Sequence, residues 1–479
     1  AVNLAHGQVV RLVFDLETPG GRVRRTRIVK GWKTADPKPV GDDYNKGRLL
    51  FEKEFAAVDD PDLILRGPVQ AVGGYLEAGP GKYDHVALIV PFAKENLRFG
   101  QPVLLEIDWP DDKPRNIGLY MYKPQKSKAL RDCLAGGITA GNLYPNSGGM
   151  QTATYLFYPG FESYVFEART MSSGYPAAIA ALRIYAIDGG LPRLAINYPE
   201  GLPHRMFGHC DEDQTFDYLL DHTTWGNPFL GTRYEQITDV LLEYYDYTGQ
   251  EAWDHPLLRY GWLFYPVLGS ESGGQYPYKP DFVPYMFRAF GKRGKSVHAI
   301  LNLHGGMPEF FRQPGRLQEW TEKGWIRLNA FGEPLSRQPT PPSNMLVPEV
   351  EAMFLGHLEK ILLQNARYDG FEGVDYCMGP SAAVGAVRTE VPKDQADKYA
   401  ERGTYSYDDF TVSLYRAEAA PQMPDFNGAD RFMKRFEYLA KAENEATWLE
   451  WNIAKVAGHL KRMRALLDKH KPALKLVVS

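Results

Sequence analysis

Residues 347–376 read VPEVEAMFLGHLEKILLQNARYDGFEGVDY, and this stretch decides the fold of the second half of the chain. Its first part has apolar residues at helical spacing, which predicts an amphipathic helix. Its second part, DGFEGVDY, is short and largely apolar, which predicts a buried strand. A helix followed by such a strand is the repeating unit of an α/β fold with a parallel sheet. The apolar stripe of the helix consists of Val350, Met353, Phe354, Leu358, Ile361 and Leu362.

The same alternation continues on both sides of this stretch, so we expect an α/β domain over residues 203–479. Its parallel sheet is either doubly wound or closed as a (β/α)8-type TIM barrel, and the absence of a GxGxxG motif or P-loop favours the barrel. Five strands are fewer than the eight of a barrel. Either a further segment or another chain completes it, or it is not closed. The predicted strands are 204–209, 259–268, 296–304, 369–376 and 473–479, and the predicted helices are 232–249, 280–294, 347–365 and 447–472.

Residues 1–202 follow a different period. Apolar and polar residues alternate in short runs separated by Gly, Pro, Asp and Asn, which predicts a β-sandwich or jelly roll. The fold class is therefore all-β followed by α/β, with a boundary near residue 202. The predicted strands include 11–17, 85–92, 101–109, 116–122, 153–159, 163–170 and 181–187.

Bulk composition excludes several classes of protein. The formal net charge is −4 with both signs mixed along the chain, so we expect no nucleic-acid partner. The sequence contains no run of about 18 apolar residues, so it predicts no membrane-spanning helix. Three cysteines without CxxC spacing predict neither a zinc knot nor a disulfide framework. Residues 1–10 lack a signal-peptide pattern, so any export signal has been removed or was never present. Aromatic residues make up 13% of the chain, which suits a surface that stacks on sugars.

Several segments together resemble the glycoside-hydrolase-like (β/α) barrels, over about residues 255–479. They are WTEKGWIRLNAFGEPL (320–335), PEVEAMFLGHLEKIL (348–362), YDGFEGVDY (368–376) and the 448–479 stretch. The third is similar to the family's YDVDGIHLDDY on the fourth strand. In the related DGxxxD pattern the last Asp is the nucleophile, but Val374 stands there in this chain. Asp375 matches the second acid of the family's DDY, so the nucleophile is not carried over directly.

Hydrolysis of a glycosidic bond needs two carboxyl groups, which a barrel supplies from the C-terminal ends of its strands. Asp375 is the first candidate, as nucleophile or general base, although a capping role fits its position equally well. Gly373 offers a place for a strand bulge that turns Asp375 toward the barrel mouth. Glu309 and Glu271, which follow predicted strands, are candidates for the second group. Glu372 points either into the barrel or toward the helices.

Candidate substrate contacts lie at the same predicted strand ends. His304 precedes two glycines that allow close approach of a ligand, and aromatic rings there suit stacking on a sugar. The acids of FGHCDEDQTFDY suit a solvated loop better than a metal site. In the N-terminal half, Trp109 and Tyr120 to Tyr122 either form a sugar-binding strip or pack in the core or between domains, and packing is the preferred interpretation. The candidate substrate-binding residues are His304, Trp262, Tyr265, Tyr376, Asp211 and Trp225.

The resemblance, together with these residues, implies a glycoside hydrolase that acts on a polysaccharide or oligosaccharide and needs no metal or organic cofactor. The alternative is a non-catalytic carbohydrate-binding or surface-layer protein with a degenerate barrel, which Val374 favours. An esterase or amidase is less well supported because no GxSxG motif occurs. A carbohydrate substrate implies a secreted, periplasmic or cell-surface location.

Overall fold

The computed structural model divides the chain into two compact units. Unit 1 comprises Ala1–Arg205 and Asp213–Gln250, and unit 2 comprises Met206–Glu212 and Glu251–Ser479. The structure describes residues 4–5, 8–18, 21–30, 45–92, 101–122, 134–141, 145–159, 163–171, 174–193, 200–201, 208–210, 230–259, 262–263, 282–302, 307–311, 314–334, 343–378 and 406–479.

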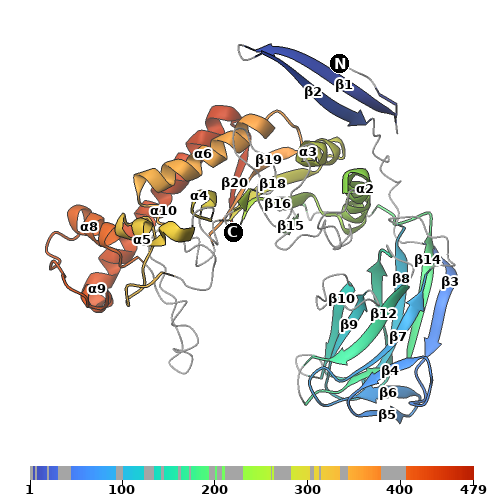
Figure 1. The fold of residues 1–479 in the computed structure, drawn as a ribbon. Helices are drawn as coiled ribbons and strands as arrows, with labels where there is room; N and C mark the ends of the chain where they lie inside the picture. The colour runs from blue at the N-terminus through green and yellow to red at the C-terminus, as the bar shows by residue number, and fades with distance from the viewer. Residues whose placement is uncertain are drawn as a thin grey trace. The chain divides into compact units, whose positions relative to one another are not determined.

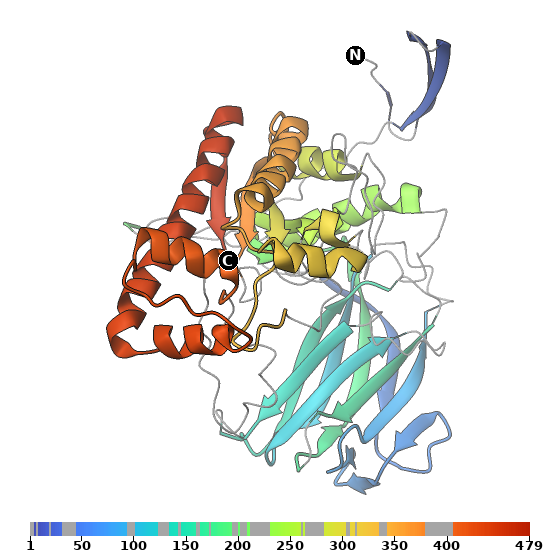
Figure 2. The same cartoon turned by 60° about the vertical axis from the view of Figure 1, so that its left-hand side comes forward.

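Unit 1 contains an antiparallel β-sandwich, as its period-two sequence predicts (Figure 2). One sheet has the order β10-β9-β12-β7-β4, with bounds Leu134–Ala140, Arg115–Tyr122, Ser163–Thr170, His85–Pro91 and Leu63–Arg66. The other has the order β11-β8-β14-β3, with bounds Met150–Phe157, Val103–Pro110, Ala181–Asp188 and Asn45–Glu54. A small sheet of β13 (Ala177–Ile179), β6 (Tyr75–Ala78) and β5 (Val69–Val72) and a separate ribbon of β1 (Val9–Thr18) and β2 (Gly21–Lys30) complete the β-structure described.

Alternate residues of the sandwich strands form one apolar core. Ile117, Leu119 and Met121 of β9 enter it, while the residues between them face outward. Trp109 also belongs to this core, so its side chain packs as expected. Burying alternating faces of two sheets is what stabilises such a sandwich.

Helix α2 (Leu230–Thr248) falls in unit 1, and part of its surface contacts the sandwich. Its Tyr244 and Tyr247 lie against a cluster that includes Leu104 and Ile187, and Glu243 accepts a hydrogen bond of 2.7 Å from the Leu191 amide. The sequence predicts this helix well, but it predicts a place in the second domain. The division into units therefore differs from a single boundary at residue 202.

The sheet of unit 2 is parallel, and its strand order follows the chain (Figure 1). Neighbouring strands run β15 (Gly208–Cys210), β16 (Ala252–Arg259), β18 (Ser296–Asn302), β19 (Phe371–Cys377) and β20 (Lys475–Val478). The short β17 (Trp262–Leu263) pairs antiparallel with β16. Within the described residues β15 and β20 are the two ends of the sheet, so the parallel α/β arrangement is confirmed while closure into a barrel is not shown.

The second parallel strand lies earlier in the chain than predicted. We predict 259–268 from its apolar residues, whereas the structure has β16 at Ala252–Arg259. Asp254, His255 and Pro256 interrupt the apolar run of residues 252–258, whereas 259–268 has a longer continuous apolar stretch. Here the pairing with β18 shifts register between Pro256 and Leu258, which is the kind of irregularity that accepts a proline.

Three long helices cover one face of this sheet. Trp253 of β16 packs on Phe290 of α3 (Phe282–Lys292), and Tyr376 of β19 packs on Phe354 of α6 (Pro348–Asn365). Helix α10 (Ala442–His470) lies along α6 and also contacts β20. No helix that the structure describes has the combined length and apolarity of a membrane span. The remaining helical segments are α4 (Pro308–Phe311), η2 (Pro314–Arg316), α5 (Leu317–Glu322), α8 (Asp409–Glu418) and α9 (Arg431–Leu439).

Helix α8 begins at a buried carboxyl group. The Asp408 Oδ1 atom accepts hydrogen bonds from the Thr411 amide at 2.9 Å and from Asn344 Nδ2 at 3.2 Å. Burial raises the pKa of Asp408 to about 6, and the bonds from Thr411 and the charge of Arg327 oppose this rise only in part. Asp408 is thus the N-cap residue of α8, and its bond to Asn344 joins this helix to the loop before α6.

Asp408→Asn is expected to change how stability depends on pH. Between pH 3.8, the ordinary pKa, and about 6, folded Asp408 holds a proton that the unfolded chain lacks. Its contribution to stability is thus complete below the lower value and is lost as the pH rises through the upper one. Relative to the variant, the wild type should lose up to about 1.4 kcal/mol per pH unit in this window. Unfolding midpoints in urea at several pH values measure the difference.

The neighbouring Asp409 provides the control. The hydrogen bond from Arg431 lowers the pKa of Asp409, so its contribution has the opposite pH dependence. Asp409→Asn should leave the loss of stability between pH 4 and 6 in place. An Asp408→Asn protein with the wild-type pH profile contradicts the assignment.

Candidate functional site

The two faces of the unit 2 sheet differ in character. Trp253 and Tyr376 point toward the helices, as their ring contacts show. Asp254, His298 and Asp375 alternate with these residues, and the strand register places them together on the other face. We call this the Asp375 face. It collects three ionisable groups from three consecutive parallel strands.

Asp375 lies near the C-terminal end of β19 and is 1% exposed. Its Oδ2 atom accepts a hydrogen bond of 3.2 Å from the Ser479 hydroxyl, and its Oδ1 atom has no hydrogen-bond partner among the described residues. Burial raises the pKa of Asp375 above its usual range. The charge of Asp254 adds to this effect, while Ser479 and His298 oppose it. A carboxyl group in this setting favours its protonated form.

His298 of β18 is held by Asp254 of β16. The His298 Nδ1 atom lies 2.7 Å from the Asp254 Oδ1 atom, and its buried Nε2 atom has no partner within the described ranges. Gly373 provides the space for the ring, since a Cβ atom there would lie 2.9 Å from His298 Cδ2 and 2.5 Å from the Lys475 carbonyl oxygen. The glycine of FEGVDY therefore serves close packing on the Asp375 face. The predicted irregularity is also present, because the pairing of β18 with β19 shifts register between Phe371 and Gly373.

Glu372 forms an ion pair with Lys475 of β20, with 3.0 Å between Oε2 and Nζ. Burial raises its pKa, but hydrogen bonds from Ser296 and Lys475 outweigh burial, so the net pKa is lowered. Such a group remains ionised at neutral pH. This environment suits neither the proton donor of a hydrolase nor a free nucleophile.

Glu309 lies on α4, and its Oε1 atom is 2.8 Å from Nε2 of His357 on α6. Its described partner thus comes from a helix rather than from the Asp375 face. Tyr376 is fully buried on the helix face, with ring centroids 5.5 Å from Phe354 and 5.4 Å from His459. That position gives the ring a packing role.

Several predicted contacts fall outside the part of the chain that the structure describes, and they stay predictions. For Trp262 the backbone of β17 is described but the side chain is not. The others in this group are Glu271, His304, Tyr265, Asp211 and Trp225.

Asp254 and His298 belong to the candidate site, and sequence analysis missed them. The available signal is an ionisable residue at the third position of a strand, as in AWDHPLL and SVHAILN. Asp254 was missed because we predicted the second strand at residues 259–268, which do not include it. Across the described ranges, no three or more His, Cys, Asp or Glu side chains are grouped as ligands for a metal ion.

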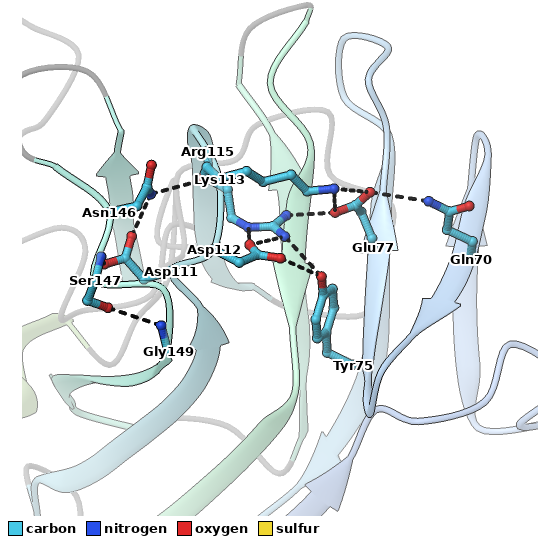
Figure 3. Close-up of polar contacts among 10 residues, drawn as sticks. All are labelled: Gln70, Tyr75, Glu77, Asp111, Asp112, Lys113, Arg115, Asn146, Ser147 and Gly149. Carbon is cyan, nitrogen blue, oxygen red and sulfur yellow. Dashed lines mark hydrogen bonds and ion pairs between the residues drawn. The ribbon is translucent and has the colours of Figure 1, made fainter.

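Unit 1 contains a second dense polar cluster, which Figure 3 shows. Arg115 at the start of β9 is fully buried, and its guanidinium donates to Glu77 Oε2 at 2.9 Å and to Asp112 Oδ1 at 2.7 Å. Lys113 also pairs with Glu77 at 2.7 Å, and the Tyr75 hydroxyl donates to Asp112 at 2.7 Å. The acids of this cluster are compensated by these partners, which is typical of a structural network.

The adjoining loop is tied to the same place by Asp111. Its carboxylate accepts hydrogen bonds from Asn146 Nδ2 at 2.7 Å and from the Ser147 amide at 2.8 Å (Figure 3). The cluster therefore connects β6, the β8–β9 turn and the loop before β11.

No family model matches this sequence, and no curated protein matches it. One solved structure with partial similarity is a family 35 carbohydrate binding module from Clostridium thermocellum. The sequence identity is 14%, the alignment covers 29% of this chain and 99% of that chain, and the TM-score is 0.21. The CBM22-1 xylan-binding domain from Paenibacillus barcinonensis Xyn10C has 11% identity, 30% and 98% coverage, and a TM-score of 0.23. The family GH115 4-O-methyl-alpha-glucuronidase BtGH115A has 10% identity, 33% and 20% coverage, and a TM-score of 0.21. At such scores the likeness carries no argument, and the sandwich is established by its own strand pairing.

Proposed function

We propose that this protein is a glycoside hydrolase and that Asp375 is its proton donor. The observation that carries the proposal is a buried carboxyl group with a raised pKa, near the C-terminal end of a parallel strand, on the face opposite the helices. A general acid must be protonated when substrate binds, and burial together with a neighbouring negative charge achieves this. The sequence alone suggested a nucleophile or base for Asp375, and its environment favours the acid.

The reaction needs a second carboxylate, and we assign this role to Asp254. It shares the Asp375 face, and its charge acts on Asp375. His298 holds its carboxylate at 2.7 Å, which fixes its orientation. Asp254 is the third residue of β16 and so lies nearer the N-terminal end of its strand than Asp375 does. The separation of the two carboxyl groups in the substrate complex decides the outcome, with retention at about 5–5.5 Å and inversion at about 6.5–9.5 Å. Asp254 replaces Glu309 in this role because Glu309 binds His357.

The parallel strands in chain order support a further part of the proposal. We infer that β15, β16, β18, β19 and β20 are five strands of a (β/α) barrel related to the glycoside-hydrolase-like barrels that the sequence resembles. Substrate contacts are then expected from residues that follow these strands, including His304 and Tyr265, together with Trp225 and Asp211. Glu271 remains a candidate for a further acid. A location outside the cytoplasm follows from a polysaccharide substrate.

A non-catalytic carbohydrate-binding or surface-layer protein is the second candidate. Val374 favours it, because this residue occupies the nucleophile position of the related family pattern and is fully buried. A barrel that has lost its nucleophile can retain sugar binding.

Reducing-sugar release distinguishes the two candidates. The protein should be incubated with a panel of neutral and acidic polysaccharides while binding to each is measured by affinity electrophoresis. We expect release of new reducing ends from at least one polysaccharide that retards the protein. Retardation without any release contradicts the hydrolase and supports the binding protein.

A further inference from the structure

The five-stranded sheet of unit 1 carries a cluster of aromatic and charged side chains on its outer face. Because Leu119 and Met121 of β9 and Phe166 and Ala168 of β12 enter the core, the residues that alternate with them face outward. They include Tyr120 and Tyr122 of β9 and Glu167 and Arg169 of β12, and the register pairs Glu167 with Tyr120 and Arg169 with Gly118.

Arg169 is the centre of this cluster. Its guanidinium carbon lies 4.0 Å from the ring centroid of Tyr120 and 5.1 Å from that of Tyr83. One terminal nitrogen is 3.4 Å from Glu167 Oε1, whereas the buried Nε atom has no hydrogen-bond partner among the described residues. Glu167 accepts a shorter bond of 2.7 Å from the Tyr122 hydroxyl. Two rings therefore orient the guanidinium, and a ligand would bind its terminal nitrogens rather than the buried Nε atom.

The rim of the cluster is accessible at Tyr83, whereas Tyr120 is 8% exposed and forms the inner wall. Tyr83 is 40% exposed and has a φ of 67°, in the left-handed region that non-glycine residues seldom adopt. Lys82 Nζ lies 4.9 Å from its ring centroid. Beside it, Tyr120 donates to Met171 Sδ at 3.3 Å, and a Cβ atom on Gly118 would lie 2.5 Å from that sulfur. Glycine in this strand thus allows Met171 to lie flat against the sheet.

We propose that the face formed by Tyr83, Tyr120 and Arg169 binds a carboxylate-bearing sugar, that is, a uronate unit of a glycan. The planar donor fork of arginine matches a carboxylate, and stacking of the guanidinium on aromatic rings fixes its plane. Arg169 and Lys82 both lie beside the Tyr83 ring, and these cationic groups favour an anionic ligand over a neutral one. The exposed ring of Tyr83 offers a platform for the pyranose. The choice of a glycan rests on the function proposed above, while the carboxylate preference rests on Arg169.

Isothermal titration of the full-length protein tests this site. The probes are a hexamer of galacturonate and a hexamer of galactose, which share their ring and differ in the carboxylate. We expect the uronate hexamer to bind more tightly. Arg169→Met should weaken that binding by about tenfold or more, which corresponds to the loss of a charge-assisted bond. Tyr83→Ala should weaken it by several fold.

Two further variants keep the result interpretable. Arg183→Met is the matched control, because this arginine lies on the other sheet and both its terminal nitrogens already bind Asp108 at 2.8 Å. It should bind the uronate hexamer as the wild type does. Arg169→Lys keeps the charge without the fork and should bind less tightly than the wild type but more tightly than Arg169→Met. Equal affinity for both hexamers, no saccharide binding, or an Arg169→Met protein with wild-type affinity overturns the proposal.

The outcome also separates this inference from the hydrolase assignment. Uronate binding that depends on Arg169, without release of reducing sugar from any polysaccharide, supports the site and contradicts the hydrolase. Turnover without uronate binding supports the hydrolase and contradicts the site.

Discussion

Asp375→Asn is expected to lower kcat by about 10²–10⁴-fold, the range usually contributed by a general acid or base. Asparagine has nearly the same shape as aspartic acid, but it has no proton to give to the leaving oxygen. The measurement uses the polysaccharide that the wild-type protein hydrolyses. A second substrate tests the role itself, since an aryl glycoside with a weakly basic leaving group needs little protonation. On that substrate the variant should lose much less activity.

The pH profile of the same pair of proteins provides an independent readout. Asp375 acts as an acid only while protonated, so kcat/KM of the wild type should fall as the pH rises through its raised pKa. The residual kcat/KM of Asp375→Asn should not show this decrease at alkaline pH. If kcat/KM falls at the same pH in both proteins, another group donates the proton.

Glu372→Gln is the matched control, because it removes an acid from the same strand. Glu372 is paired with Lys475 at the sheet surface, and surface pairs contribute little to stability. Its activity should stay within about twofold of the wild type. A large loss in Glu372→Gln with none in Asp375→Asn assigns the chemistry to the other carboxylate of β19.

The sequence predicted the α6–β19 unit closely because its two periods are clear. The predicted helix 347–365 and strand 369–376 match Pro348–Asn365 and Phe371–Cys377 within a few residues. The predicted helix 232–249 likewise matches α2 at Leu230–Thr248, but a helical pattern does not specify which elements the helix contacts. Tyr244 and Tyr247 of that helix lie partly buried against the sandwich cluster. Periodicity therefore determined the elements and left their partners open.

The candidate site was harder to predict because its members are distant in sequence. Asp254 and His298 are 44 residues apart and meet only through the parallel register of β16 and β18. Asp375 stood out because it shares the short segment 369–376 with Asp369 and Glu372, yet the residues near it have different roles. Glu372 pairs with Lys475, and Tyr376 packs against the helices. The crowding of acids directed attention to β19, and the pleat of the strand decides which acid lies on the Asp375 face.

Arg115→Met is expected to destabilise unit 1 by about 3–5 kcal/mol, the usual cost of removing one partner from a buried ion pair. Glu77 and Asp112 would lose their hydrogen bonds to a guanidinium that is fully buried. Burial raises the pKa of Glu77, and Lys113 and Arg115 bring the net value below normal, so the carboxylate depends on these cations. Calorimetry of the full-length variant should show that unit 1 unfolds at a lower temperature than in the wild type. The unfolding transition of unit 2 serves as an internal reference.

Arg183→Met separates burial from the mere loss of an ion pair. Arg183 binds Asp108 with two bonds of 2.8 Å, but its side chain is 22% exposed whereas that of Arg115 is fully buried. Water can solvate Asp108 after the change, so the loss should be about 1 kcal/mol or less. Adding Glu77→Gln to Arg115→Met should restore part of the stability, because the double variant no longer buries a poorly compensated charge. Equal losses for the two arginines, with no recovery in the double variant, mean that the packing of the Arg115 side chain rather than its charge stabilises this end of the sandwich.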